Sequence, residues 1–335
     1  MRWTDEHQDA VFIDALNVSR WDVEVFRSLH EGRLTAINAT VAIWEGAAET
    51  VRQIGRWKRL FKEHADLVRP VTCPQDILAA RDEGRCGVIL GFQNASPVED
   101  EIDLLDVYHA LGVRCIQLAF NDRNFCGDGC YEPSDAGLSS FGREVITRMN
   151  DLGLLLDLSH VGLKTSIQAV DSSSRPAAIT HANPSALVEH PRNKPDHLIK
   201  AVAARGGVIG ATAFPPFLPK GFESTIEDFV DVIVYLVNLV GVDHVGIGCD
   251  FVQNQDREFF RRLCFGKRKA DPVLTLPYPV PYPQGLSSPV DFPNVAERLS
   301  ARGYGEDEIR NIMGENFLRL FRQVWGSSNA STTDA

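Results

Sequence analysis

Short apolar runs rich in β-branched residues recur along the chain and alternate with longer segments of helical period, and this alternation constrains the fold most. It is typical of parallel βα units, because each parallel strand must be followed by a crossover that packs back onto the sheet. The chain is therefore predicted to be an α/β protein. Eight runs are predicted to be strands: residues 11–18, 34–44, 87–92, 114–120, 153–159, 177–181, 207–212 and 244–251.

The segments between these runs carry apolar residues at intervals of three and four, as helices that pack on a sheet do. Eight strands with intervening helices in 335 residues favour a closed (β/α)8 TIM-type barrel, although a doubly wound open sheet has the same pattern. The predicted helices cover residues 45–65, 102–111, 140–152, 164–170, 198–205 and 225–240.

We expect a single domain over residues 1–325, because no internal boundary interrupts the alternation. Residues 270–291 carry six prolines and little periodicity, which predicts an ordered surface loop after the last strand. Closing helices at residues 292–302 and 307–324 should pack outside the barrel. The polar residues 326–335 should form a flexible tail.

Composition argues against several partners and compartments. A formal net charge of −11 repels phosphate backbones and anionic lipid, so nucleic acid is not an expected partner. We find no run of eighteen apolar residues and no export signal in the polar first ten residues, so no membrane association is expected. Seven cysteines, an odd number, fit reduced thiols better than a disulfide framework, and we predict a cytoplasmic protein.

Polar side chains gather where the predicted strands end. In a (β/α)8 barrel these carboxyl ends converge on one mouth, where the chemistry takes place. Strands five and six end at His160 and His181, and strand eight ends at Asp250. Two histidines and a carboxylate suit a hydrolytic zinc site, in which the ion lowers the pKa of bound water and the carboxylate takes its proton. Histidines at strand ends can also simply satisfy loop backbone groups.

Two other motifs are less specific. Cys126 and Cys130 form a C-x3-C pair that could bind zinc or close a disulfide, yet without a second pair an ordinary glycine-rich loop explains it better. Arg192 and Lys194 follow strand six and could hold a substrate carboxylate, or form a solvated basic turn.

Six motifs occur together and in a fixed order along the chain. The motifs are GLSSFG at 137–142, DLSHV at 157–161, TH at 180–181, RN at 192–193, GCDF at 248–251 and GENFLR at 314–319. On these motifs the chain resembles the membrane (renal) dipeptidase family of metallopeptidases, nearly end to end. The resemblance implies an amidohydrolase-like (β/α)8 barrel in which zinc assists cleavage of a dipeptide or similar small amide, frequently in a homodimer.

The resemblance also implies roles for single residues. His160 and His181 match two histidine metal ligands, Arg192 matches the residue that holds the substrate carboxylate, and Asp250 matches the acid near the metal-bound water. We expect Asp250 and Gln93 to be catalytic. The residues expected to contact the substrate lie at or near strand ends: Arg192, Phe120, Asn121, Asn17 and Tyr131.

The chain departs from the family pattern on the other strands. The family reads DGHND in strand one, where the histidine and the last aspartate bind metal, but here residues 14–18 read DALNV. Gln93 stands where the family has a bridging glutamate, and Phe120 where it has a substrate-polarising histidine. Without these carboxylates the charge of two zinc ions would stay uncompensated, so one ion, or none, is expected.

Three hypotheses follow. The first is a dipeptidase-type hydrolase with one zinc ion held by His160 and His181. The second is an enzyme that performs proton transfer on a small amino-acid-like ligand without hydrolysis. The third is a non-catalytic binding protein on the same fold. We favour an enzyme because both histidines, Arg192 and Asp250 occur together.

Overall fold

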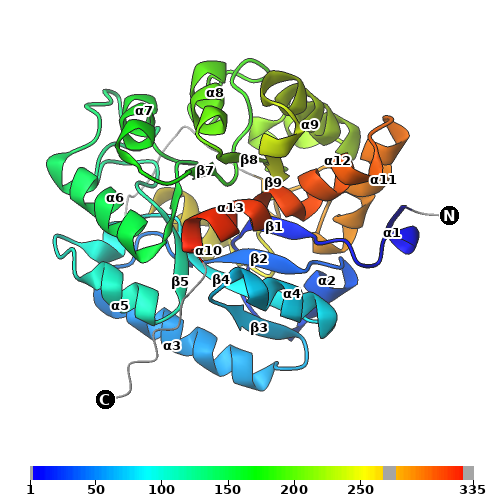
Figure 1. Ribbon diagram of the computed structural model, residues 1–335, viewed down its shortest axis with the longest axis horizontal. Helices are drawn as coiled ribbons and strands as arrows, with labels where there is room; N and C mark the ends of the chain where they lie inside the picture. Colours follow the sequence, from blue (N-terminus) through cyan, green and yellow to red (C-terminus); the bar gives the residue numbers. More distant parts are fainter. Residues whose placement is uncertain (1–2, 267–276, 327–335) are drawn as a thin grey trace.

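The computed structural model describes residues 3–266 and 277–326, and a barrel of parallel strands forms its centre. Eight strands follow one another around the barrel, each parallel to the next and joined to it through helices (Figure 1). The predicted (β/α)8 barrel is therefore confirmed. Its strands are β1 (Ile13–Asn17), β2 (Ala36–Ala42), β4 (Cys86–Phe92), β5 (Val113–Gln117), β6 (Leu155–Asp157), β7 (Ala178–Ile179), β8 (Val208–Ala211) and β9 (Val245–Ile247).

The barrel closes between its first and last strands, just beyond the carboxyl end of β9. Asn17 forms a parallel bridge with Phe251. The backbone N–H of Val18 donates to the carbonyl of Phe251 at 2.9 Å, and that of Asp250 donates to the carbonyl of Leu16 at 3.1 Å. This seam places Asp250 beside the end of β1.

Helices surround the strands, and local capping defines where they begin and end. In α6 (Ser140–Leu152), the hydroxyl of Ser139 accepts the N–H of Gly142, and Gly153 ends the helix at a φ of 72°. The other helices around the barrel are α2 (Val23–Glu31), α3 (Ala47–Glu63), α4 (Pro74–Asp82), α5 (Leu104–Ala110), α7 (Leu163–Ser172), α8 (Asp196–Ala204), α9 (Ile226–Val240) and α11 (Pro293–Ala301).

A C-terminal helix, α13 (Asn316–Trp325), covers the amino-terminal end of the barrel and lies across the centre of the view in Figure 1. Its buried face, which includes Phe317 and Phe321, packs in one cluster with residues from the starts of the strands. Gly314 allows this approach, because a Cβ there would lie 2.3 Å from the carbonyl oxygen of Val11. The carboxyl ends of the strands therefore open on the opposite side.

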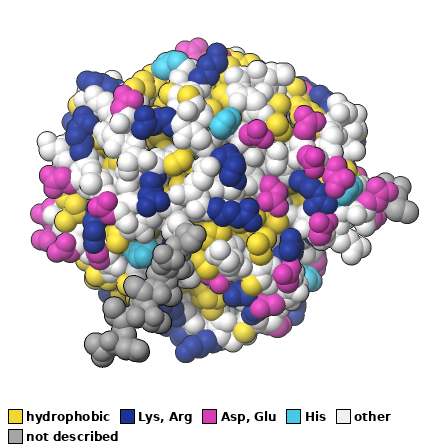
Figure 2. Space-filling model, in the orientation of Figure 1, with side chains coloured by type: hydrophobic (Ala, Val, Ile, Leu, Met, Phe, Trp, Pro, Cys, Tyr) yellow, Lys and Arg dark blue, Asp and Glu magenta, His cyan; other side chains and the backbone are white. Residues whose placement is uncertain are grey.

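Charged side chains of both signs share the face seen in Figure 2. Lys and Arg are interspersed there with Asp and Glu, and hydrophobic side chains show in small patches between them. Within residues 3–266 and 277–326, every helix is too short or too polar to cross a bilayer.

Several elements differ from the sequence-based predictions. A ninth strand, β3 (Val68–Val71), pairs with β4 outside the barrel path, and helices α2 and α4 were not predicted. Helix α10 (Arg257–Phe265), which lies between the last strand and the proline-rich loop, was not predicted either. Its start is capped by the carboxylate of Asp256, which accepts the N–H of Phe259 at 2.6 Å.

The predicted proline-rich loop and tail are described only in part. Residues 270–276 of the loop and residues 327–335 of the tail lie outside the described residues. From residue 277 onward the loop is irregular as far as a short 3-10 turn at Pro289–Asp291, after which α11 begins.

Candidate active site at the carboxyl ends of the strands

Two buried histidines face each other at the mouth of the barrel. His160 follows β6 and His181 follows β7, and their side chains are almost fully buried. The Nε2 atoms of the two rings are 3.0 Å apart. Nδ1 of His160 is 2.7 Å from Oδ1 of Asn121, and Nδ1 of His181 is 2.8 Å from Oγ1 of Thr180. Each ring is therefore held at Nδ1 and directs Nε2 at its neighbour.

Two buried cations lie beside the histidine pair. Arg192 is 1% exposed, and its guanidinium donates to the carbonyl oxygens of Ser159 and, at 3.0 Å, of His181. The ammonium of Lys194 donates to the carbonyl oxygen of Val161 at 2.7 Å. In the part of the chain that the structure describes, neither cation forms an ion pair with a carboxylate. The histidines therefore lie in a positively charged environment.

This environment keeps both imidazoles neutral. Burial, and after it the charge of Arg192, holds the pKa of His160 and of His181 well below the usual value of about 6.5. Burial also lowers the pKa of Lys194 to about 8. Near neutral pH each imidazole thus carries one N–H and one lone pair, and the lone pair is what a metal ion binds.

Asp250 lies at the seam of the barrel in a left-handed backbone conformation, with a φ of 60°. Its side chain keeps some contact with solvent, yet desolvation by the surrounding protein raises its pKa to about 7, and the charge of Arg192 opposes that rise. Asp14 is fully buried nearby, and burial raises its pKa to about 8. Asp250 can therefore gain or lose a proton near neutral pH.

The other side of the mouth is apolar. Phe120 is 4% exposed and packs in one cluster with Leu16, Val18 and Ile43. Its ring stacks on that of His160, with the ring centroids 4.0 Å apart. Hydrophobic packing thus occupies the positions at which the family pattern has further polar residues.

Gln93 and Asn17, two of the three predicted carboxamides, bond to their own neighbours. Nε2 of Gln93 donates to Oγ1 of Thr40 at 2.9 Å. Oδ1 of Asn17 accepts the N–H and the hydroxyl of Ser19, at 3.1 and 2.7 Å, while its Nδ2 is buried without a partner among the described residues. The structure does not bring Gln93 or Asn17 into a hydrogen bond with the described histidine pair.

The loop after β5 holds His160 from its outer side. Asn121 has a φ of 61°. A Cβ on Gly129 would lie 2.1 Å from the carbonyl carbon of Asn121, so the backbone at Gly129 packs directly against the backbone at Asn121. The N–H of Tyr131 donates to the carbonyl of Asn121 at 2.9 Å, and that of Cys130 to the carbonyl of His160 at 2.8 Å. Asn121 therefore positions His160, and Tyr131 lies beside it with a partly buried side chain.

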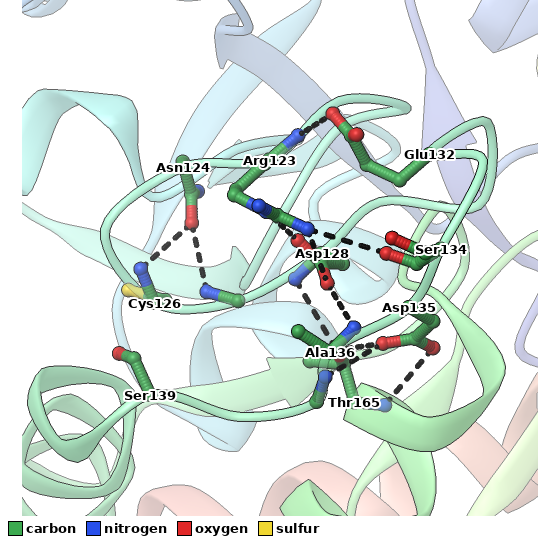
Figure 3. A network of polar contacts seen from close by, with 12 residues as sticks. Arg123, Asn124, Cys126, Asp128, Glu132, Ser134, Asp135, Ala136, Ser139 and Thr165 are labelled. Atoms are coloured by element: carbon green, nitrogen blue, oxygen red, sulfur yellow. Dashed lines mark hydrogen bonds and ion pairs between the residues drawn. The ribbon is translucent and has the colours of Figure 1, made fainter.

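A polar network fixes this loop (Figure 3). Arg123 forms an ion pair with the buried carboxylate of Asp128, which also accepts the N–H of Ala136. Asp135 accepts the hydroxyl of Thr165 at 2.7 Å and so ties the loop to α7. Cys126 and Cys130, which belong to the same loop, are both free thiols, so they form no disulfide.

The two Nε2 atoms at the mouth are spaced much as two nitrogen ligands of one zinc ion would be. Two nitrogens bound to tetrahedral zinc at about 2.0–2.1 Å lie roughly 3.3 Å apart, close to the 3.0 Å between Nε2 of His160 and Nε2 of His181. Within residues 3–266 and 277–326 no three side chains of His, Cys, Asp or Glu gather around one point as metal ligands would. The histidine pair is therefore the candidate metal site, with two protein ligands where a catalytic zinc site usually has three.

Sequence reasoning missed two residues that act on this pair. Asp157 and Thr180 lie in the same motifs as the histidines, and the hydroxyl of Thr180 lies between the Asp157 carboxylate and the ring of His181. The sequence signal that could have identified them is their position: Asp157 precedes His160 by three residues, and Thr180 directly precedes His181. The predicted roles of the site residues themselves stay predictions.

The family model and two curated relatives indicate the same family. The family described as membrane dipeptidase (peptidase family M19) matches residues 8–258 and 280–334. Dipeptidase tcpJ of Claviceps purpurea is 29% identical over 279 residues, which are 82% of this chain and 60% of that protein. Dipeptidase aclJ of Aspergillus oryzae is 26% identical over 287 residues, 84% of this chain and 62% of that protein. The chain thus spans about three fifths of the length of these curated relatives.

A solved structure extends the similarity over the whole fold. The crystal structure of an amidohydrolase from Pseudomonas aeruginosa superposes with a TM-score of 0.93 at 41% sequence identity. The match covers 98% of this chain and 100% of that one. Since the family match spans most of the sequence, the chain belongs to the membrane dipeptidase family, peptidase family M19.

Proposed function

We propose that the protein is a hydrolase that cleaves a dipeptide, or a small amide of an amino acid, with a single zinc ion held by His160 and His181. The observation that carries this proposal is the pair of neutral imidazoles whose Nε2 atoms face each other at 3.0 Å. Relatives named dipeptidases and a structural neighbour named an amidohydrolase support the same reaction class.

The residues around the pair supply the other functions. Zinc held by the two histidines would supply a Lewis acid and would lower the pKa of bound water to about 7. Asp250, whose own pKa is about 7, can take up the proton released in hydrolysis. Arg192 contributes a fixed positive charge, and its Nε hydrogen has no partner among the described residues, so it can attract a substrate carboxylate.

Roles for the remaining site residues follow from their positions. Phe120 and Tyr131 would form walls of the substrate pocket, and Asn121 would line it beside His160 while holding that ring. Gln93, which follows β4, and Asn17, the last residue of β1, would contribute polar groups to the mouth.

We also infer that the enzyme acts as a homodimer in the cytoplasm, without a nucleic-acid or membrane partner. The homodimer is an expectation from the family resemblance. The compartment rests on the cysteines, since every described cysteine is a free thiol. Light scattering coupled to size-exclusion chromatography tests the dimer, because a monomeric mass at micromolar concentration would contradict it.

A second function has one specific observation in its favour. Among the described residues no three His, Cys, Asp or Glu side chains converge as metal ligands would. Two buried cations, Arg192 and Lys194, lie beside the histidines instead. This arrangement also suits metal-free binding of a small amino-acid-like ligand, with or without proton transfer by Asp250.

Metal analysis separates the two functions. Protein purified without chelator should contain about one equivalent of zinc and hydrolyse members of a dipeptide panel, and His160→Ala should lose both properties. His197→Ala, at an exposed position on α8, is the matched control and should retain both. Binding of an amino acid or dipeptide by metal-free protein, unchanged by zinc, would refute the hydrolase and favour the second function.

A further inference from the structure

A buried carboxylate lies behind the histidine pair and only accepts hydrogen bonds. Oδ1 of Asp157 accepts the backbone N–H of Ser159 at 3.1 Å and that of Thr180 at 3.0 Å. The hydroxyl of Ser159 is 2.6 Å from the same oxygen, and that of Thr180 is 2.7 Å from Oδ2. Four donors on one carboxylate favour its ionised form, although burial raises the pKa of Asp157.

The hydroxyl of Thr180 has three side-chain partners but only one hydrogen to donate. Its Oγ1 is 2.7 Å from Oδ2 of Asp157, 2.8 Å from Nδ1 of His181 and 3.1 Å from Oγ of Ser159. The hydroxyl of Ser159 donates its own hydrogen to Oδ1 of Asp157. The ionised carboxylate of Asp157 has no hydrogen and can only accept, so the hydroxyl of Thr180 donates its hydrogen bond to Oδ2. Oγ1 must then accept a hydrogen bond, and Nδ1 of His181 must donate it. A neutral His181 with its hydrogen on Nδ1 carries its lone pair on Nε2.

The same reasoning applies to His160 on the neighbouring strand. Its Nδ1 is 2.7 Å from Oδ1 of Asn121, an acceptor, so this nitrogen also carries the hydrogen. Two lone pairs then face each other across 3.0 Å. This arrangement is unfavourable without a cation between the nitrogens, and it is favourable with one.

We propose that Asp157, acting through the hydroxyl of Thr180, is a positioning residue that fixes the tautomer of His181 and so keeps the lone pairs of His160 and His181 open to a metal ion. This inference rests on the proposed metal-dependent function. In the opposite tautomer, Nε2–H of His181 would donate to Nε2 of His160, and the pair would bond to itself. Neither Asp157 nor Thr180 is itself a metal ligand in this proposal.

Asp157→Asn reverses the chain of hydrogen bonds with almost no change in shape. The carboxamide keeps one oxygen for the three donors on Oδ1, and its Nδ2 donates to Oγ1 of Thr180. The hydroxyl then donates to Nδ1 of His181, which moves the hydrogen of the ring to Nε2. Thr180→Val removes the hydroxyl, and Thr180→Ser retains it and serves as the matched control.

Two readouts test the proposal. Imidazole ¹⁵N shifts, measured by long-range ¹H–¹⁵N NMR on metal-free protein, should show Nδ1–H for His181 in the wild type and in Thr180→Ser, but Nε2–H in Asp157→Asn. Competition with a chromophoric chelator should show zinc affinity about 10- to 100-fold weaker in Asp157→Asn and Thr180→Val, and within about threefold of wild type in Thr180→Ser.

An Nε2–H tautomer in the wild type, or unchanged zinc affinity in folded Asp157→Asn, would overturn the proposal. Circular dichroism shows whether each variant folds, and if Asp157→Asn does not, the comparison of Thr180→Val with Thr180→Ser decides. Should the wild type bind no zinc and hydrolyse no dipeptide, the proposed function fails. The tautomer measured in metal-free protein still decides whether Asp157 and Thr180 orient His181.

Discussion

The two sides of the barrel mouth differ in chemistry, although one ring of strands builds both. On the side of β6 and β7, the rings of His160 and His181 each have a defined hydrogen-bond partner at Nδ1. On the side of β1 and the loop after β5, Leu16, Val18 and Phe120 pack as an apolar cluster.

The difference explains why one ion is expected rather than two. A second ion needs carboxylates, and a carboxylate in an apolar cluster would lack partners for its charge. Conversely, the hydrogen-bonded side keeps its rings oriented without metal, because the carboxamide of Asn121 holds Nδ1 of His160 and the hydroxyl of Thr180 holds Nδ1 of His181.

The largest effect is expected from placing a charge in the apolar side. Val18→Asp, at a position that is 3% exposed, should lower the free energy of unfolding by about 3–5 kcal/mol, because the charge would be buried without a partner. Urea denaturation measures the loss. Val51→Asp, at a position 44% exposed, is the control and should change stability by less than about 0.5 kcal/mol. A Val18→Asp protein as stable as wild type that binds two zinc ions would contradict the comparison.

A smaller but still large effect is expected from the buried cation on the polar side. Arg192→Met removes the donors to the carbonyls of Ser159 and His181 and should cost about 3 kcal/mol. Loss of the positive charge should also raise the pKa of His160 and His181, which NMR titration measures. Arg192→Lys keeps the positive charge, so it should partly restore the low histidine pKa values, although a single ammonium cannot reproduce both hydrogen bonds of the guanidinium. Unchanged histidine pKa values in Arg192→Met would mean that burial alone sets them.

The pH dependence of stability should distinguish the contribution of the buried acids Asp14 and Asp250 from that of the two histidines. Asp14 has a pKa of about 8 in the folded protein and near 3.8 when unfolded, so the folded state binds more protons between these values and stability falls as pH rises. The histidines have lowered pKa values and act in the opposite direction, but only below about pH 6.5. Between pH 6.5 and 8 the acids therefore dominate.

Asp14→Asn should reduce this loss. Over the interval from pH 6.5 to 8 the wild type should lose about 1–2 kcal/mol through Asp14 that the variant does not lose. Thermal unfolding at a series of pH values measures the slope. An equal slope in both proteins would show that Asp14 ionises normally in the fold.

The smallest effect is expected where the two sides touch. Phe120→Leu removes the stack on His160 and should cost about 1 kcal/mol of stability. Zinc affinity should stay within about threefold of wild type, since Asn121 and not Phe120 sets the tautomer of His160. A large loss of zinc affinity would show that the apolar side orients the ring after all.

The barrel could be predicted because its strands are buried apolar runs at regular intervals, and the rule that carboxyl ends converge brought His160 and His181 together correctly. The strand β3 escaped prediction because its four residues include Arg69 and Pro70 and it pairs with β4 alone. Helix α10 escaped because it directly precedes the proline-rich stretch.

The hydrogen-bond partners of the site residues could not be predicted from the sequence, although their positions at the strand ends could. Asn121 bonds to His160 through a left-handed backbone turn that Gly129 makes possible, and such loop geometry leaves no periodic pattern in a sequence. Likewise, the sequence placed Gln93 at the mouth, but its hydrogen bond to Thr40 depends on the register between β2 and β4.

Phe120 belongs to both sides of the mouth at once, since it fills the apolar cluster and lies flat on a histidine ring. Reintroducing polar ligands at this position and at Leu16 or Val18 would therefore be non-additive, because each change alone buries an unpaired polar group among its unchanged neighbours. A variant with polar residues at all of these positions should therefore lose less stability than the sum of the single variants, because the introduced groups can bond to one another.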